Sequence, residues 1–456
     1  MDSSIRIRKK FLLVTIIALS AFHPVLFGQG FTLKQCVEYA NKNNGNIINA
    51  NYDITIAQKK VKEQIGTMLP QVDVSGSYTD NLKLSTTVLP GELMGKPGTQ
   101  IPVTMGTKHN LSGNVQLTQK IFDPTFGVAL QAAKISKQFS EQTFRKTTEQ
   151  TAYNISGTYY QTLVIEKQKN SLSATIVASE KLLTSAELKY KNGMAKKVDV
   201  DKIRVSYNNT KSQLQQSELS YKQSLNTLKY QMGMPVDSSI VLFDITVQNV
   251  EIQTLEKQAD SFSVDNLIDY QLQKTNLSAY ETDKKRNMAG YLPSLSFSAN
   301  YGYSAMRNEF DFTKSGGDWF PSSNIGLSLK IPIFDGLQRH AKVSQSILNI
   351  EKSKINIHLT EQSIKVDLSN SEIQYRNAID NIHNEKDNLD LAESVYKNTQ
   401  LQYQQGAGSS LDLVQAESSY RESLNNYYNK LLNLYIARVN LEQSKGTLMN
   451  YINNLK

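Results

Sequence analysis

Apolar and polar residues alternate along two segments in the second half of the chain. Between Ile325 and Ile333 an apolar residue occupies every second position of the segment 324–334, and small or polar residues stand between them. The segment 294–306 shows the same alternation, with leucine, phenylalanine, tyrosine and alanine opposite serine, asparagine and glycine. Because side chains of a β-strand point alternately to opposite faces, the pattern predicts two strands that each have one apolar and one polar face.

The first half of the chain carries weaker versions of this alternation at about 71–80 and 110–121. Each of the four segments has about ten residues, which is the length that a tilted strand needs to cross a lipid bilayer. The polar faces consist of small, largely uncharged residues, which suits a water-filled interior. We expect the apolar faces to contact lipid through Val72, Val74, Leu111, Val115, Leu295, Phe297, Ile325, Leu327, Leu329 and Ile331.

The alternative to a membrane sheet is a soluble sandwich whose apolar faces form a core. Aromatic residues near the strand ends, among them Tyr78, Tyr301 and Trp319, favour the membrane, because membrane barrels carry an aromatic girdle there. An open sheet of four strands would leave unpaired backbone groups in lipid, and bacterial barrels have about eight strands or more. The chain is therefore expected to complete a barrel with copies of itself.

Long helices are predicted between and after the strands. The segments 124–192 and 336–405 contain no proline beyond Pro124 itself, and at 1.5 Å per residue each helix would be roughly 100 Å long. After a short tip, a second helix is expected at 199–233 and at 411–454. A half-length helix is expected before each pair of strands.

The tips between these helices have clear sequence signals. Gly193 and Gly406 suit the position just after a helix C-terminus, where glycine adopts a left-handed conformation. Asp199 and Asp412 suit the first turn of the next helix, because a carboxylate caps free N–H groups and complements the helix dipole. We therefore expect two helical hairpins with tight tips.

Heptad seams predict how the helices pack. Apolar residues recur with a 4,3 spacing along 172–190, 200–228 and 420–448. Polar residues such as Ser179 interrupt the first two seams, and Arg438 interrupts the third. Seams of this kind are typical of coiled-coil contacts.

The chain contains a duplicated unit. The pattern Tyr-x-x-Gly-x-x-x-x-x-Asp occurs at 190–199 and again at 403–412, and Ile-Phe-Asp occurs at 121–123 and at 333–335. Self-similarity over such a long period indicates a repeated structural unit. Each unit has the order half-length helix, two antiparallel strands, long helix, tip and further helix.

Boundaries follow from the repeat and from the N-terminus. Residues 1–28 have the basic start, short apolar run and polar exit of a secretory signal peptide. We expect the first repeat at 29–235, a connector at 236–262 and the second repeat at 263–456.

Composition excludes several classes of protein. Hydrophobic residues make up 39% of the chain and the mean hydropathy is -0.42, so a helical protein with several membrane spans is excluded. Cys36 is the single cysteine and is expected to be a small buried residue. The five histidines lack the spacing of a metal motif, and no glycine-rich phosphate loop is present. We therefore expect no enzyme, cofactor or metal, and, without a basic cluster, no nucleic acid partner.

Together these motifs resemble the TolC family of bacterial outer membrane efflux proteins, in the form found in Bacteroidetes-type bacteria. The resemblance rests on Leu-Pro before a strand, Ile-Phe-Asp after a strand, the duplicated tip pattern and the terminal Gly446-Thr447-Leu448. It implies a mixed α/β membrane protein, a homotrimer whose 12-stranded β-barrel in the cell outer membrane joins a periplasmic α-helical barrel. It also implies a periplasmic adaptor (membrane fusion) protein and an inner-membrane RND or ABC pump as partners.

The resemblance also assigns roles to the tips. The residues expected to contact the adaptor are Gly193, Val198, Asp199, Gly406, Leu411 and Asp412. The charges expected near the aperture are Asp387, Asp390, Glu393 and Lys397. Family members can narrow a closed tip with acidic rings, but here no acid lies between Glu393 and Asp412, and lysines crowd the tips. We predict that the aperture is not a simple cation-selective acidic gate; a solvated helix face is the simpler interpretation of these charges.

Two alternatives stay open at this point. The duct of a type I protein secretion system would have the same architecture as the duct of a drug efflux pump. A secreted coiled-coil structural or adhesin protein would explain the seams, but it would not explain the four alternating strands. The segment 81–109 is expected to be a long loop that partly covers the barrel mouth.

Overall fold

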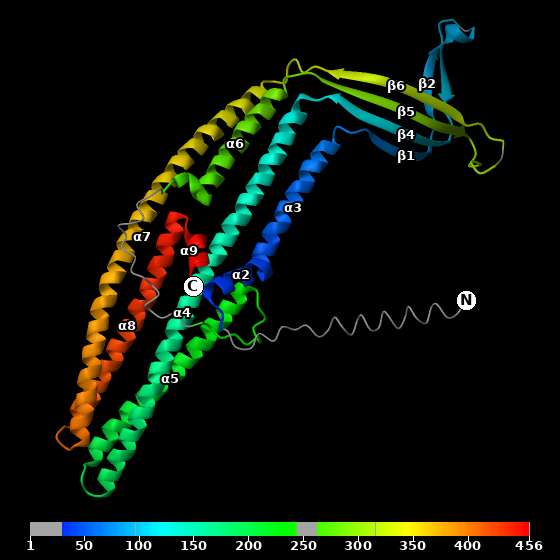
Figure 1. Cartoon of the computed structure of the whole chain (residues 1–456). Coiled ribbons are helices and arrows are strands. Elements are labelled where there is room, and N and C mark those ends of the chain that lie inside the picture. The colour runs from blue at the N-terminus through cyan, green and yellow to red at the C-terminus, as the bar shows by residue number, and fades with distance from the viewer. Residues whose placement is uncertain (1–29, 96, 244–261, 315, 456) are drawn as a thin grey trace, which may run out of the picture. The chain divides into compact units, whose positions relative to one another are not determined.

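The computed structural model describes residues 30–243 and 262–455, apart from residues 96 and 315 (Figure 1). The signal peptide expected at 1–28 and most of the connector expected at 236–262 lie outside these residues. The chain divides into two compact units, which are described one at a time. The first combines Met1–Ile48, Thr147–Ser263 and Ile364–Lys456, and the second combines Asn49–Lys146 and Val264–Ser363.

A four-stranded antiparallel sheet forms the centre of the second unit. Its strands, in spatial order, are β1 (Gln71–Asp80), β4 (His109–Phe122), β5 (Ser294–Arg307) and β6 (Phe320–Lys330). Two strands come from each half of the chain, and the halves meet where β4 pairs with β5. Within the described residues β1 pairs with β4 alone and β6 with β5 alone, so both outer strands have a free edge.

The register of the sheet separates the two faces. Directly opposed residues share a face, and one apolar row runs from Val74 through Val115 to Tyr301. A second apolar pair, Leu295 with Leu329, lies on the same face. On the other face a polar row is formed by Asp73, Gln116, Asn300 and Asn324.

The fourth strand differs from its prediction. It was expected at 324–334, whereas β6 spans Phe320–Lys330. Pro332 explains the early end, because proline has no N–H to donate and restricts the residue before it. Ile331 therefore lies outside the strand, with 57% of its surface exposed, and not on the strand face where it was expected. The strand begins earlier because β5 extends far enough to pair with Phe320.

The segment 81–109 is not a plain loop. It contains a two-stranded antiparallel hairpin, β2 (Ser85–Pro90) and β3 (Gln100–Met105), joined through the 3-10 helix η1 (Gly91–Met94). Threonine and valine, which favour strands, explain the pairing. In Figure 1 the hairpin lies at the end of the sheet opposite to the end from which the helices leave.

Four helices, of which α6 alone lies wholly in the second unit, connect to that other end of the sheet. They are α3 (Gly45–Gly66) before β1, α4 (Pro124–Lys191) after β4, α6 (Ile268–Ala289) before β5 and α7 (Gln338–Gln404) after β6. The second long helix starts two residues later than its predicted start at 336, because Gly336 and Leu337 have positive φ values of 66° and 67°. Such a conformation cannot belong to a right-handed helix.

The first unit packs helices around an apolar core. Its further helices are α2 (Leu33–Asn43), α5 (Lys197–Met232), α8 (Ser410–Lys445) and α9 (Leu448–Asn454). The side chain of Thr32 caps α2 and that of Gln35 bonds back, so the helix begins with a capping box. Leu33, Cys36 and Val37 lie on one face of α2 and are buried in the core, as expected for the cysteine.

Two predicted helices are interrupted in the structure. The helix expected at 411–454 ends at Lys445, because Gly446 adopts a left-handed conformation with φ 73° and α9 follows. The half-length helix of the first repeat is divided into α2 and α3 at Asn44, which has an extended backbone. After the break at Gly446 the chain packs onto the core of the first unit, where Leu448 and Ile452 of α9 are buried.

Candidate functional site

The first tip joins α4 to α5. Gly193 has φ 75°, and the backbone N–H of Met194 donates to the carbonyl of Lys189 at 2.8 Å. This left-handed turn satisfies carbonyls that the end of α4 would otherwise leave free. The next helix begins at Lys197, two residues before its predicted start at 199, so Asp199 lies in its first turn.

The second tip repeats this arrangement with a stronger cap. Gly406 has φ 80°, and the N–H of Ala407 donates to the carbonyl of Gln402 at 2.9 Å. The hydroxyl of Ser409 accepts from the N–H of Asp412 at 3.1 Å and donates to the Asp412 carboxylate at 2.7 Å. Asp412 therefore fixes the first turn of α8.

The two tips contact each other within one chain. The hydroxyl of Ser410 donates to the Asp199 carboxylate. The Lys189 ammonium donates to the carbonyls of Tyr403 and Gln404 at 3.3 and 3.2 Å and lies 5.2 Å from the centre of the Tyr403 ring. A cation is favourable at this position, because the C-terminus of a helix carries partial negative charge.

Each tip exposes one apolar side chain at the start of its second helix. Val198 and Leu411 are 54% and 58% exposed. Nothing lies within 4 Å of a side chain added at Gly193 or at Gly406. The structure thus leaves equivalent positions of both tips accessible, whereas their flanking residues are held by capping.

A small apolar core lies beneath the tips. It is made of Leu182, Ala186, Val200, Ile203, Tyr396, Tyr403, Leu413 and Ala416, from all four helices. Burial raises the pKa of Tyr403, and the charge of Asp199 raises it further. The tips therefore rest on packed side chains and are not loose loops.

A buried polar layer continues this core. Glu417 is 1% exposed, and its carboxylate accepts from the hydroxyls of Ser179 at 3.1 Å and Thr210 at 3.3 Å. Burial, with the charge of Glu417 added, raises the pKa of Tyr396 to about 12. The sequence pattern did not identify Glu417. The signal for it was indirect: Ser179 and Thr210 occupy seam positions where apolar residues are expected, and a buried hydroxyl requires a polar partner.

The charges expected near the aperture form local ion pairs. Asp390 pairs with Lys386, and the Glu393 carboxylate lies 2.7 Å from the Lys397 ammonium, each pair being four residues apart on α7. The hydrogen bond to Asp390 raises the pKa of Lys386. Asp387 is exposed. This geometry suits a solvated helix face, because pairs at this spacing meet on the helix surface.

Arg438, which interrupts the third seam, is buried in an aromatic cluster of the first unit. Its guanidinium lies 2.7 Å from the Glu442 carboxylate and stacks 5.4 Å from Tyr375 and 5.3 Å from Tyr451. A buried charge requires such a partner. The interruption of the seam therefore marks an ion pair within the core and not a solvent-exposed face.

The apolar sheet face is exposed in the single chain. The exposed fractions are 78% for Val74, 79% for Ile325 and 70% for Leu327. The register places nine of the ten residues expected to contact lipid on this one face; Ile331 is the exception. A continuous exposed apolar face of this size needs a covering phase or partner.

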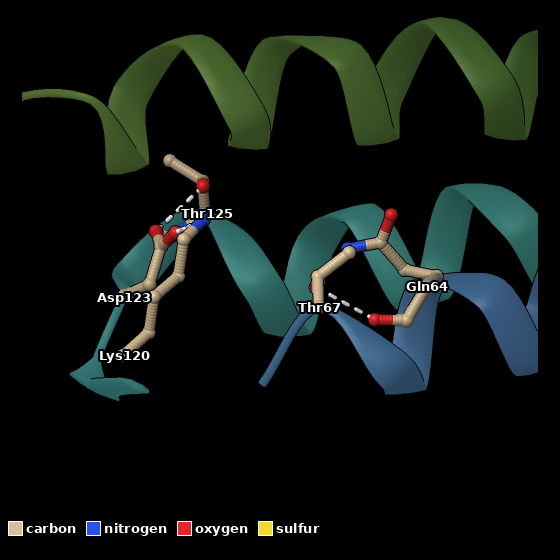
Figure 2. Close-up of polar contacts among 5 residues, drawn as sticks. All are labelled: Gln64, Thr67, Lys120, Asp123 and Thr125. Carbon is tan, nitrogen blue, oxygen red and sulfur yellow. Dashed lines mark hydrogen bonds and ion pairs between the residues drawn. The ribbon is translucent and has the colours of Figure 1, made fainter. Parts of the chain in front are cut away.

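One aspartate lies between β4 and α4, and another lies between β6 and α7. Figure 2 shows Asp123 between Lys120 and Thr125. Its carboxylate accepts from the Thr125 N–H at 2.9 Å, from the Thr125 hydroxyl at 2.6 Å and from Lys120 at 2.9 Å. Burial acts to raise the pKa of Asp123, but these hydrogen bonds outweigh it and hold the pKa below its ordinary value. Asp335 accepts from the Arg339 N–H at 3.1 Å in the same way.

Within the described ranges, no three histidine, cysteine, aspartate or glutamate side chains lie close enough to hold a metal ion. No helix in that part of the chain is both long and apolar enough to cross a membrane.

Comparisons with known proteins agree with this architecture. The model of the family described as outer membrane efflux protein matches residues 37–234 and 269–447. The outer membrane protein TolC of Escherichia coli is 21% identical over 96% of this chain and 87% of its own length. The proteases secretion protein PrtF of Dickeya chrysanthemi is 20% identical over 77% of this chain and 73% of its own.

Solved structures show the same fold. The CmeC outer membrane channel of Campylobacter jejuni has a TM-score of 0.69 at 16% identity, covering 91% of this chain and 86% of that one. The outer membrane protein VceC of Vibrio cholerae has a TM-score of 0.68 at 15% identity, covering 91% and 96%. Because the family match covers most of the chain, the resemblance found in the sequence is confirmed: the chain belongs to the outer membrane efflux protein family, and it is an outer-membrane exit duct that extends into the periplasm.

Proposed function

We propose that three copies of the chain close one barrel of twelve strands in the outer membrane, continued by a tunnel of their helices through the periplasm. The duct conducts substrate passively, and an inner-membrane pump with its periplasmic adaptor supplies both the energy and the choice of substrate. The observation that carries this proposal is the four-stranded sheet, which combines two free edges with one exposed apolar face.

The free edges require partners in lipid. A strand edge in the bilayer leaves N–H and C=O groups without water or protein to bond, at a cost of several kcal/mol for each group. Pairing β1 of one copy with β6 of the next removes both edges. Three copies of four strands then give the twelve strands that the family resemblance implies, and every apolar face contacts lipid.

The helices carry a second unpartnered surface. On α7, apolar residues recur at intervals of seven and four and are 56–68% exposed in the single chain; they are Leu348, Ile355, Leu359, Val366 and Ile373. This spacing is that of a coiled-coil seam. A helix of a neighbouring copy would bury it, which supports assembly below the sheet as well.

The polar sheet face suits a water-filled passage. Asn300 donates to Asn324 at 2.9 Å, and the hydroxyls of Ser77 and Ser112 lie 2.8 Å apart, so its amides and hydroxyls bond to each other across strands. At these positions the surface is hydrated and uncharged. This supports a conduit whose specificity comes from its partners.

The exposed tips support docking of an adaptor. Val198 and Leu411 offer equivalent apolar contacts beside Gly193, Asp199, Gly406 and Asp412, which are the positions that the resemblance assigns to the adaptor interface. A tip with two similar apolar contacts suits a partner that binds both hairpins alike.

Protein secretion is the second candidate function. It is favoured by the relative PrtF, whose name describes secretion of proteases. The duct itself does not separate this function from small-molecule efflux. The genes beside this one would: a pump of the RND class indicates efflux of small molecules, and a secretion ABC pump with a protease gene indicates type I secretion.

The test is the absolute mass of the protein extracted from outer membranes in mild detergent, measured by light scattering with the detergent contribution subtracted. A mass of three chains is expected, and heat denaturation of the same sample should give one chain. A soluble monomer, or an elongated dimer that needs no detergent, would contradict the proposal and favour a secreted coiled-coil structural protein.

A further inference from the structure

A cavity of about 340 Å³ lies in the second unit, where the strands meet the helices. It is lined by the ends of β4 and β6, the starts of α4, β5 and α7, and the end of α6. Its volume is within the range of sites that hold small organic molecules. Phe122 and Asp123 of the first Ile-Phe-Asp motif line this cavity, and Pro332 and Arg339 do so from the second half, so each half of the duplicated chain contributes to it.

Cations dominate the polar part of the wall. Lys120, Lys330 and Arg339 line the cavity, with Asp123 as the one acidic lining residue, which leaves an excess of two positive charges. Two segments far apart in the sequence supply these cations, Lys120 from the first half of the chain and Lys330 and Arg339 from the second. Their convergence on one cavity therefore comes from the fold and not from a local run of basic residues.

The neighbouring acids are already engaged. Asp123 accepts three hydrogen bonds, two from Thr125 and one from Lys120. Asp335 accepts from the backbone of Arg339 and lies 3.5 Å from its side-chain Nε. Within the part of the chain that the structure describes, no carboxylate is paired with Lys330. The ammonium of Lys330 is thus free to bind an anion.

The remaining wall is mixed: Thr125, Ser294 and Ser296 contribute hydroxyl groups, and other residues contribute apolar surface. Phe122, Leu292, Leu295 and Pro332 line the cavity together with Ala289. Phe122 and Leu292 are 51% and 53% exposed in the single chain. A ligand that fits both parts has an anionic head and an apolar body, because a free inorganic ion would leave the apolar wall uncovered.

We propose that this junction binds an amphiphilic organic anion, with its phosphate or carboxylate at Lys330, Lys120 and Arg339 and its apolar body against Leu292 and Pro332. The ligand is either an anionic lipid of the membrane or an anionic amphiphile in transit; both present the same chemistry. The inference rests on the proposed duct, because only a membrane-embedded sheet brings the junction to lipid and to cargo.

The experiment uses the full mature chain in nanodiscs of zwitterionic phosphatidylcholine and native mass spectrometry. Decyl phosphate is the probe, and decanol and inorganic phosphate are the matched ligands that lack the charge or the apolar body. One decyl phosphate per chain is expected. Lys330→Gln should weaken its retention roughly fivefold, because one desolvated charge contact is lost.

Two further variants separate charge from folding. Lys83→Gln removes an exposed lysine in the connection after β1 and should leave retention unchanged. Arg339→Gln should weaken retention, whereas Arg339→Lys should restore most of it because the positive charge is kept. Equal retention of decanol or inorganic phosphate, or equal weakening by Lys83→Gln, would overturn the proposal.

A second arm identifies the source of the ligand. In nanodiscs that contain phosphatidylglycerol, wild-type protein that retains this lipid more than the Lys330→Gln variant identifies the membrane as the source. Retention of decyl phosphate alone identifies cargo in transit. The same spectra report the oligomer: a trimer without anion preference refutes this site and leaves the duct intact, whereas a monomer refutes the proposed duct itself.

Discussion

Asp123 shows how a single side chain joins strand and helix. It accepts a hydrogen bond from Lys120 of β4 and caps α4 by accepting two from Thr125. Asp123→Ala should cost about 1 kcal/mol at the start of the helix, as is usual for loss of an N-cap. Hydrogen exchange of the amides at 125–128 should then become roughly fivefold faster. Asp387→Ala, on an exposed helix surface, is the matched control and should leave those amides unchanged.

The same carboxylate predicts a pH dependence. Because the pKa of Asp123 is lower in the folded protein than in an unfolded chain, the cap stabilises α4 above the ordinary aspartate pKa of about 4. This stability is lost as the pH falls through the lowered folded pKa. Protection at 125–128, corrected for intrinsic exchange, should fall in that acid range for the wild type and stay flat for Asp123→Asn. Identical profiles for both proteins would exclude the cap as the cause.

The charges expected near the aperture lead to a third prediction at this scale. Asp390 and Glu393 are each paired with a lysine on α7, so little net negative field results. Reversal potentials across planar bilayers in a salt gradient should therefore show no strong cation selectivity. The double variant Asp390→Asn/Glu393→Gln should change the reversal potential little. Strong cation selectivity that disappears in this variant would contradict the prediction.

Residue types predicted surfaces better than they predicted buried polar groups. Cys36 was expected to be buried, and it is. Glu417 and Arg438 were not expected in a core, because charged residues in a heptad pattern ordinarily indicate a solvated face. The partners of Glu417 come from other helices, and Arg438 lies against the ring of Tyr375 on another helix besides its local partner Glu442, so only the folded chain reveals the full set.

At the scale of elements, alternation located strands well where both faces were distinct. The strand expected at 71–80 and β1 have the same bounds. The strand β4 extends one residue beyond its expected range at both ends, and β5 extends one residue beyond its expected C-terminal end. The shift of β6 came from Pro332 and from the length of its partner, which a pattern within one segment does not contain. The hairpin β2–β3 was missed because β2 does not alternate between apolar and polar residues and because each strand contains a proline, Pro90 and Pro102, which argues against a strand.

Gly302 provides a test of strand packing. A Cβ added there would lie 2.8 Å from the carbonyl oxygen of Gly113 and 3.1 Å from the side-chain oxygen of Asn114. Gly302→Ala should therefore push β5 from β4 and destabilise the sheet by roughly 1–3 kcal/mol, as overpacking does. The temperature at which the oligomer dissociates in detergent should fall.

The matched control lies on the neighbouring strand. Nothing is within 4 Å of a Cβ added at Gly113. Gly113→Ala should leave the dissociation temperature nearly unchanged. If the two alanine variants behave alike, close approach of the strands is not the reason for glycine at position 302.

At the scale of the whole molecule, a single chain holds only part of the information. The duplicated motifs identify two equivalent halves, and pairing of β4 with β5 joins them into one sheet. The two outer edges and the exposed seam of α7 have no counterpart within the described chain. Closure is therefore a property of the assembly, and it is inferred from what the single chain leaves unsatisfied.

Cysteine cross-linking tests that closure directly. If β1 of one copy pairs with β6 of the next, Val74→Cys on β1 should form a disulfide with one of three cysteines placed on the same face of β6, at Ser323, Ile325 or Leu327. Three positions are needed because the register between copies is unknown and a disulfide requires Cα atoms about 4.4–6.8 Å apart. Oxidation in outer membranes should yield a covalent trimer on a non-reducing gel.

The control places the first cysteine where no second copy can reach it. Val115→Cys lies on β4, which is paired on both sides within its own chain, and combined with Ile325→Cys it should give no link between copies. Native Cys36 is buried and should stay unreacted. If none of the three β1–β6 pairs forms a link, or if the links stop at a dimer, the sheet is closed in some other way. A trimer from one pair alone would also fix the register between copies, because cysteines two residues away on β6 lie too far to react.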